Sequence, residues 1–215
     1  MTSSTYTPVS QQNPGTPPRE FVDFAWTADN AAEAARIIAL YPAGRQASAV
    51  MPLLWLAQYQ MRDATGSAWL PVPVIEFVAR QLGMPYIRAY EVASFYTMYN
   101  LKPVGRFHVQ VCGTTPCQLR GSDDIMRACK DKGLKKGGST PDGLFTLTEV
   151  ECLGACANAP MVQINDDNYE DLTYDSMTAI LEALARGEMP TPGSAIGRTA
   201  SCPEGGPTSL LEVAG

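Results

Sequence analysis

The sequence predicts an α+β protein in which an N-terminal helical bundle is followed by an α/β domain with a mixed sheet. Two observations support this fold class. Apolar residues recur with a helical period over residues 20–100, and the pattern changes to strand-like alternation after Asn100. Beyond that point the expected order is strand, helix, three strands, helix. The expected segments are a disordered N-terminus, the bundle, the α/β domain and an irregular Pro/Gly-rich tail, at residues 1–19, 20–100, 101–188 and 189–215.

Four helices are expected in the bundle, and residues at their ends favour helix starts and stops. Asp29 or Asn30 can cap the first helix, and Ser48 can cap the second, because their side-chain oxygens can accept from exposed backbone N–H groups. Gly83 follows the third helix, where a left-handed residue is commonly needed. The four expected helices cover residues 31–40, 49–63, 72–82 and 86–94.

The α/β domain is expected to contain four strands and two helices. Phe107, Val109 and Val111 alternate with polar residues, so they would share one face of the first strand. The expected strands cover residues 106–112, 145–150, 160–165 and 169–172. Ser122 and Asp175 can cap the helices that follow them. Those helices cover residues 123–130 and 176–186.

Composition excludes several functional classes. The chain has 215 residues, 45% of them hydrophobic, and a formal net charge of −6, which argues against a nucleic-acid binder. The longest apolar stretch, residues 49–57, is far shorter than the roughly 20 residues that cross a bilayer, so no direct membrane insertion is expected. Residues 1–18 lack the pattern of a secretion signal or an Arg-rich transit peptide. We therefore expect a cytoplasmic protein.

Four cysteines form two closely spaced pairs, Cys112-Gly-Thr-Thr-Pro-Cys117 and Cys152-Leu-Gly-Ala-Cys156. The first pair follows the first expected strand, and the second pair follows the second strand. If these strands are parallel neighbours, both loops leave the sheet at the same end and bring the four sulfurs together. Four thiolates, two for each iron, can hold a [2Fe–2S] cluster. The small residues between the cysteines would let backbone N–H groups approach the cluster.

Three other interpretations of the cysteines remain open. A structural zinc site can also use four thiolates, although its pairs are often spaced C-x2-C. Two disulfides are uncommon in a cytosolic protein, and a thiol-redox enzyme would normally carry C-x-x-C. Of the remaining cysteines, Cys129 is expected in the core and Cys202 as a free thiol in the tail. His108 is the sole histidine, whereas a Rieske-type cluster needs two.

The chain lacks a glycine-rich dinucleotide fingerprint. The glycines at residues 137–143 fall between a helix and a strand, which is the wrong order for a phosphate-binding loop. We therefore expect that the chain binds neither nicotinamide nor flavin by itself, and we assign no catalytic residue.

Taken together, the motifs resemble the 24 kDa [2Fe–2S] subunit family of NADH:quinone oxidoreductase, respiratory complex I. The cysteine segments carry most of this resemblance, and the bundle adds to it. The matching segments are residues 112–117, 151–162 and 165–172, with 49–54, 69–71 and 90–99 in the bundle.

The resemblance implies a thioredoxin-like C-terminal domain with one [2Fe–2S] cluster, held at Cys112, Cys117, Cys152 and Cys156. It also implies an electron-transfer subunit without a complete active site of its own. FMN and NADH would bind to a partner subunit, and the cluster would exchange single electrons with that FMN. A larger iron–sulfur subunit would be a second partner, and the assembly would lie on the cytoplasmic side of a bacterial inner membrane.

Two alternatives accompany this expectation. Related subunits occur in the diaphorase part of soluble NAD-linked hydrogenases and formate dehydrogenases. A protein of another class, a zinc-stabilised interaction module, would use the same cysteines without electron transfer.

Overall fold

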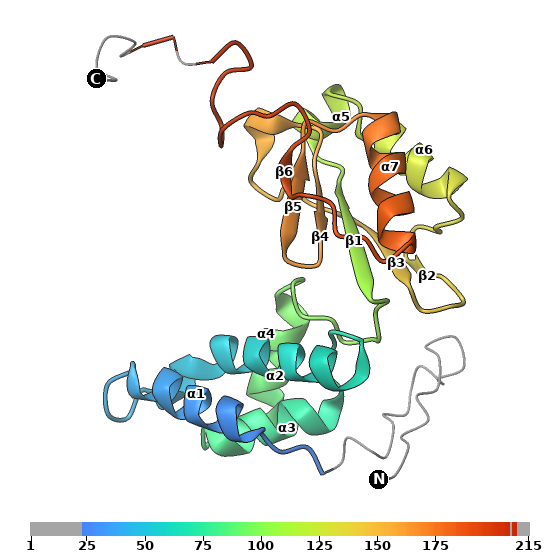
Figure 1. Ribbon diagram of the computed structural model, residues 1–215. Helices are drawn as coiled ribbons and strands as arrows, with labels where there is room; N and C mark the ends of the chain where they lie inside the picture. Colours follow the sequence, from blue (N-terminus) through green and yellow to red (C-terminus); the bar gives the residue numbers. More distant parts are fainter. Residues whose placement is uncertain (1–22, 207, 210–215) are drawn as a thin grey trace. The chain divides into compact units, whose positions relative to one another are not determined.

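The computed structural model describes residues 23–206 and 208–209. The expected disordered N-terminal segment, residues 1–19, lies outside these described residues. The chain divides into two compact units between Arg106 and Phe107, and Figure 1 shows helices in the first and a sheet with helices in the second.

The first unit is built from α-helices, which confirms the expected helical bundle. Its four helices are α1 (Ala28–Ala39), α2 (Val50–Thr65), α3 (Val72–Gln81) and α4 (Tyr86–Phe95). A single 3₁₀ turn, η3 (Gln46–Ala49), leads into α2. The bounds of the third and fourth helices agree with expectation to within one residue.

The caps of the first two helices differ from expectation. Thr27, not Asp29 or Asn30, occupies the N-cap of α1, and its hydroxyl accepts from the Asn30 backbone N–H at 3.3 Å. Ser48 lies inside η3 and does not cap α2. At α1 several residues that can cap occur close together, so side-chain chemistry alone does not select the starting residue. At α2 the 3₁₀ turn takes up Ser48, and Ala49 stands at the N-cap without a side-chain hydrogen bond.

The core of the bundle is apolar, and α2 adds buried glutamines to it, among them Gln58. Leu53, Leu54 and Ile75 are fully buried. The Gln58 side chain donates to the Met98 carbonyl oxygen at 3.1 Å and accepts from the Asn100 N–H at 2.8 Å. These hydrogen bonds satisfy a buried amide and fix the chain that follows α4 against α2.

The second unit has a mixed sheet covered by helices, which confirms the fold class. The strands are β1 (Phe107–Cys112), β2 (Gly138–Ser139), β3 (Phe145–Val150), β4 (Val162–Ile164), β5 (Asp167–Glu170) and β6 (Gly193–Ser194), in the order β2-β3-β1-β4-β5-β6. The β1–β3 and β5–β6 pairs are parallel, and the other pairs are antiparallel. The helices are α5 (Thr115–Leu119), α6 (Ser122–Asp131) and α7 (Tyr174–Ala185).

The core of the second unit lies between the sheet and two helices. As expected, Phe107, Val109 and Val111 of β1 are buried together, and they share a cluster with Ile125 of α6 and Leu181 of α7. Figure 1 shows α6 and α7 side by side at one face of the sheet. Because β1 and β3 pair in parallel from Phe107 to Cys112, both strands end at the same edge.

Several local expectations in this unit were wrong. Gly121, with φ 106°, is the N-cap of α6, and the expected cap Ser122 is its first helical residue. Thr173, not Asp175, caps α7, and it exchanges hydrogen bonds with Ser176 in a capping box.

Strand lengths also differ. The expected strand at 160–165 shortens to β4, and β5 starts at Asp167, two residues before the expected strand at 169–172. Besides 3₁₀ turns, the structure adds one α-helix and two strands that the pattern did not predict, namely α5, β2 and β6. β6 lies within the segment expected to be an irregular tail.

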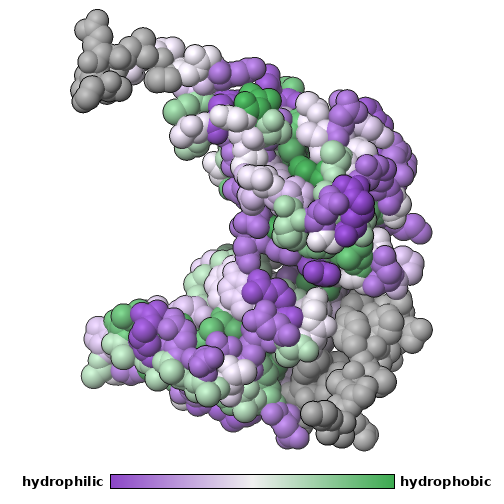
Figure 2. Space-filling view, viewed as in Figure 1, coloured by the Kyte–Doolittle hydropathy of each residue, from purple (hydrophilic) through white to green (hydrophobic). Residues whose placement is uncertain are grey.

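The visible surface mixes hydrophilic and hydrophobic residues (Figure 2). Some large apolar side chains are exposed, including Phe95 at the end of α4 and Leu119 at the end of α5. Within residues 23–206 and 208–209, none of the helices has both the length and the apolar character needed to cross a membrane.

Candidate metal centre

The first cysteine pair is buried at the end of β1. Cys112 is the last residue of β1, and Cys117 follows in α5; each is 1% exposed. Cys117 was expected in a loop, but the segment from Thr115 to Leu119 forms a short helix with Pro116 in its first turn. Proline is tolerated there because that N–H lacks an intrahelical partner anyway.

The second pair is exposed and lies after β3. Cys152 precedes Gly154, whose φ of 88° turns the chain, and Cys156 begins the 3₁₀ turn η4 (Cys156–Asn158). The Sγ atoms of Cys152 and Cys156 are 3.3 Å apart. The tight turn therefore places two sulfurs side by side.

The two pairs face each other, as the parallel pairing of β1 and β3 predicts. Leu153 and Ala155, from the loop of the second pair, pack against the buried cluster that contains Cys112 and Cys117. Cys112 interacts electrostatically with both Cys152 and Cys156. The fold thus brings together all four cysteines singled out from the sequence.

Hydrogen bonds surround the sulfurs of Cys112 and Cys152. Burial raises the pKa of the Cys112 thiol. Hydrogen bonds outweigh this effect and bring the pKa below its ordinary value. They come from the hydroxyl and N–H of Thr114, from Cys117 and from the Leu153 N–H. The Gly154 N–H, followed by Cys156, lowers the pKa of Cys152. These groups favour thiolates, which are the form that binds iron.

The other cysteine of each pair, Cys117 or Cys156, has a pKa above its ordinary value. Burial raises the pKa of Cys117 to about 11, with a further contribution from Cys112, while the Met161 N–H opposes the shift. The pKa of Cys156 is raised mainly by its hydrogen bond with Cys152, and loss of solvent contact adds to this shift. Four thiolates this close repel one another, so positive charge on bound metal is needed to hold all four ionised.

The donor set fits a two-iron centre. Within the described part of the chain, the two pairs do not close into one group of three or more ligands around a metal position. Each pair supplies two sulfurs, and a [2Fe–2S] cluster takes two thiolates on each iron, so the chemistry of the donor set fits such a cluster. Backbone N–H groups from both loops approach the sulfurs. Hydrogen bonds of this kind help to set the reduction potential of iron–sulfur clusters.

Gly113 keeps the first loop close to β3. Its N–H donates to the Val150 carbonyl oxygen at 3.0 Å. A Cβ at this position would lie 2.6 Å from Oε1 of Glu149, whose carboxylate is paired with Lys136. Glycine thus lets the chain leave β1 beside β3 without displacing that ion pair.

The remaining candidates are not among the four grouped thiols. Cys129 is fully buried in the core of the second unit, as expected, and burial raises its pKa to about 12. Nε2 of His108 lies 2.9 Å from the hydroxyl of Thr148, and burial lowers the histidine pKa to about 4. Cys202 is half-buried in the C-terminal segment.

Sequence reasoning missed two polar residues around the cysteines. The hydroxyl of Thr114 lies 3.2 Å from Sγ of Cys112, and Asn158 is buried two residues after Cys156. Their place within or beside the cysteine motifs was a usable signal. Their hydrogen-bond partners depend on the fold and could not be read from the pattern.

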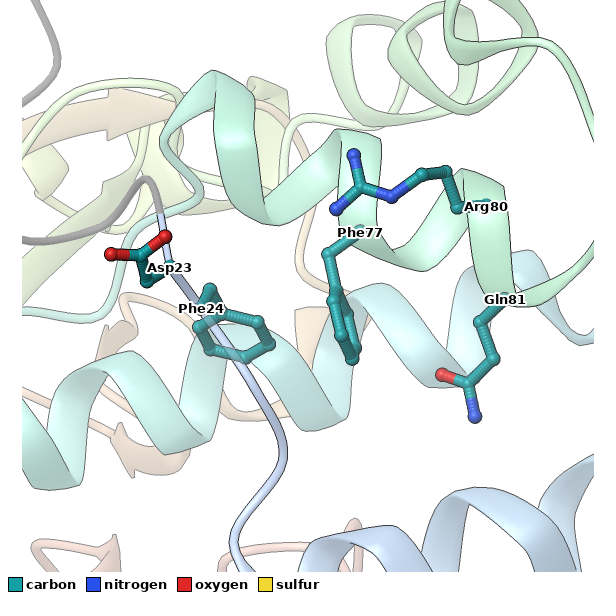
Figure 3. Close-up of a pocket in the computed structure, with 5 residues that line it drawn as sticks. All are labelled: Asp23, Phe24, Phe77, Arg80 and Gln81. Atoms are coloured by element: carbon teal, nitrogen blue, oxygen red, sulfur yellow. The ribbon is translucent and has the colours of Figure 1, made fainter.

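The bundle carries a separate, open pocket of about 710 Å³. Figure 3 shows the rings of Phe24 and Phe77 beside each other, packed edge to face with centroids 5.1 Å apart, and Arg80 and Gln81 lie on the same helix as Phe77. Trp26 donates from Nε1 to Oε1 of Gln81 at 2.6 Å, so this amide already has a partner. The pocket lies in the first unit and contains none of the cysteines.

A family model described as thioredoxin-like [2Fe-2S] ferredoxin matches residues 34–185. The chain belongs to this family. Two relatives from Rickettsia bellii and Rickettsia conorii, both named as the E subunit of NADH-quinone oxidoreductase, are 57% identical over 166 residues, covering 77% of this chain and 96% of each relative. They confirm the resemblance on which the sequence-based identification rested.

A solved structure of an NAD⁺-reducing [NiFe]-hydrogenase is similar in fold, with a TM-score of 0.53 and 20% identity. The similarity covers 65% of this thioredoxin-like ferredoxin but only 23% of the hydrogenase chain. The family establishes the thioredoxin-like fold class and a [2Fe–2S] cluster as the cofactor, which favours iron–sulfur chemistry over a zinc site.

Proposed function

We propose that this chain is the electron-transfer component of an NADH-quinone oxidoreductase that corresponds to its two Rickettsia relatives, with one [2Fe–2S] cluster held by Cys112, Cys117, Cys152 and Cys156. The observation that carries the proposal is the 57% identity to these relatives over 96% of their length. The paired arrangement of the four thiols supports the choice of ligands, because it matches the two-per-iron need of the cluster.

The chain's own residues would tune and insulate this centre. When bound, the cluster supplies a site that takes up and releases one electron at a time. Cys112 and Cys117 anchor one side in the protein interior, and the Thr114 hydroxyl and the Leu153 and Gly154 N–H groups favour the charged sulfurs. These groups stabilise negative charge, which increases when the centre is reduced.

The division of labour follows from what the sequence lacks. Without a nucleotide fingerprint in the chain, NADH and FMN would bind to a partner subunit. FMN would accept a hydride, two electrons at once, and this chain would exchange electrons with it singly. A larger iron–sulfur subunit would be a further partner, and the assembly would lie at the cytoplasmic face of the inner membrane.

A soluble hydrogenase diaphorase is the second candidate, because the hydrogenase shares the fold. At 19–20% identity that likeness concerns the fold alone, whereas the NADH-quinone oxidoreductase relatives are far closer in sequence. Co-purification from the native source with quinone-reductase or with hydrogenase activity separates these candidates.

The decisive experiment measures iron, sulfide and zinc in anaerobically purified protein, with EPR before and after dithionite. About two irons and two sulfides per chain, with a spin-one-half signal only after reduction, are expected for a one-electron [2Fe–2S] centre. Cys152→Ser should lose most of this signal, while Cys202→Ser serves as a matched control and should keep it. Stoichiometric zinc without a signal would refute the proposed function.

A further inference from the structure

A segment after α7 returns along the sheet to the cysteine loop. We call residues 193–202 the C-terminal strap; it lies beyond residues 34–185, which the family model matches. Its first residues form β6, which pairs in parallel with β5, and the Ala195 N–H donates to the Glu170 carbonyl oxygen at 2.9 Å. The strap therefore extends the edge of the sheet that carries Glu170 and Asp171.

A buried ion pair fixes the strap at this edge. The side chains of Arg198 and Asp171 are only 12% and 4% exposed, and Nη2 of Arg198 donates to Oδ1 of Asp171. Nε of Arg198 donates to Oδ2 of Asp171 at 3.1 Å, and the Ser194 hydroxyl donates to the same oxygen at 2.7 Å. A two-point arginine–carboxylate pair with this burial constrains geometry far more than an exposed pair.

Asn158 connects the strap to the turn that begins with Cys156. Its side-chain amide donates to Oε2 of Glu170 at 2.6 Å and to the Ala200 carbonyl oxygen at 2.7 Å. Its backbone carbonyl oxygen accepts from the Asp171 N–H at 2.7 Å. One buried residue of η4 is thus held by Glu170 of β5, by Asp171 directly after β5, and by the strap.

We propose that Arg198 and Asn158 are positioning residues for the cluster: the strap, anchored through Asp171, fixes η4 and thereby the direction of the Cys156 sulfur. This inference rests on the proposed ligand set. The exposed pair needs such an anchor, because Cys152 and Cys156 lie at the surface while Cys112 and Cys117 are held in the interior. The connection from Arg198 to Cys156 runs through Asp171 and Asn158.

Loosening the strap should alter the cluster and not only the fold. Without Arg198, the Asp171 carboxylate is buried with the Ser194 hydroxyl as its remaining side-chain donor, so the edge that holds Asn158 rearranges. A shifted Cys156 changes the coordination of one iron, and the g values and potential of the reduced centre report that change. A role confined to folding would lower the melting temperature and leave both unchanged.

The test compares full-length Arg198→Ala, Arg198→Lys and Asn158→Ala proteins, each reduced and measured by EPR and by redox titration. Arg186→Ala is the matched control, because Arg186 pairs with Glu188 at the surface, where the two side chains are 58% and 60% exposed. We expect Arg198→Ala and Asn158→Ala to shift the g values and the midpoint potential. They should also lose iron to a chelator about tenfold faster, which corresponds to a barrier lower by about 1.4 kcal/mol. Arg198→Lys should restore part of the wild-type behaviour, and the control should match wild type.

Wild-type g values and potential in both Arg198→Ala and Asn158→Ala would overturn the inference, whatever their melting temperatures. If Arg198→Ala fails to fold, Ser194→Ala removes a single hydrogen bond to Asp171 and should give a smaller shift in the same direction. An unchanged spectrum and potential in Ser194→Ala would then overturn the inference. A wild-type protein without any reduced-state signal would instead refute the proposed function, and this inference with it.

Discussion

Replacing Thr114 by valine should lower the potential of the cluster. The Thr114 hydroxyl lies 3.2 Å from Sγ of Cys112, and it also lowers the pKa of Cys152, so it serves one sulfur of each pair. A thiolate has no proton to give, which means that the hydroxyl must donate when iron is bound. Valine keeps the branched shape at Cβ and removes this donor.

The size of the effect follows from one hydrogen bond. A neutral hydrogen bond contributes about 1 kcal/mol net, and a one-electron couple shifts by about 59 mV for each tenfold change in its equilibrium constant, or about 1.4 kcal/mol. If the full bond distinguished the reduced from the oxidised state, the shift would be about 40 mV. Reduction adds negative charge and strengthens the bond, so removing the donor makes the potential more negative by up to this amount.

A redox titration followed by EPR measures this shift directly. Thr114→Ser is the matched variant, because it keeps the hydroxyl and loses only a methyl group. The midpoint potential of Thr114→Val should therefore be lower than that of wild type and of Thr114→Ser, while the iron content of all three proteins is the same. Equal potentials in the valine and serine variants would refute the assignment of the hydroxyl as a donor.

Three further predictions concern the second unit. Ile125→Ala removes a fully buried side chain from the core and should lower the free energy of unfolding by about 2–5 kcal/mol in a denaturant titration; a loss below about 1 kcal/mol would contradict this packing. Cys129→Ala should cost about 1 kcal/mol in the same assay and leave iron and sulfide unchanged, whereas lost iron would make Cys129 a ligand. His108 has a pKa of about 4 in the folded protein, because burial lowers it, and about 6.5 when unfolded. Between these values the unfolded chain binds more protons, so stability falls as pH falls, by up to about 1.4 kcal/mol per pH unit. His108→Gln should flatten this part of the stability–pH curve, and an unchanged slope would show that His108 does not cause it.

The regular parts of the fold were predictable because their signals are local. The alternation of apolar and polar residues predicted the bounds of β1 to within one residue, and the bounds of β3 are the expected Phe145–Val150. The helix starts were less predictable, since a cap depends on which of several neighbouring residues adopts an extended backbone. Thr27 lies two residues before Asp29, and only the backbone at Thr27 distinguishes them.

The short elements were not predictable because distant residues create them. α5 contains a proline and five residues, so its sequence resembles a loop. β6 exists because Gly193 and Ser194 meet β5, and their own sequence does not favour a strand.

Spacing was enough to propose the four cysteines as ligands, but it did not reveal their surroundings. The spacing of the pairs indicated two thiolates per iron, and their convergence depended on the parallel pairing of β1 and β3. Arg198 gave no signal, because its partner Asp171 becomes its neighbour only when the strap reaches β5. Long-range hydrogen bonds of this kind are set by the fold as a whole.

The unequal exposure of the two cysteine pairs bears on how the cofactor enters the protein. Cys112 and Cys117 lie in the interior, and α6, β2 and β3 separate them in sequence from the exposed Cys152 and Cys156. The pairs meet only after β3 has joined β1, so a nascent chain presents two unconnected dithiols. If these four cysteines hold the cluster as proposed, the complete ligand set exists only once the sheet has formed, and Cys152 and Cys156 are the thiols that an incoming cluster can reach from solvent.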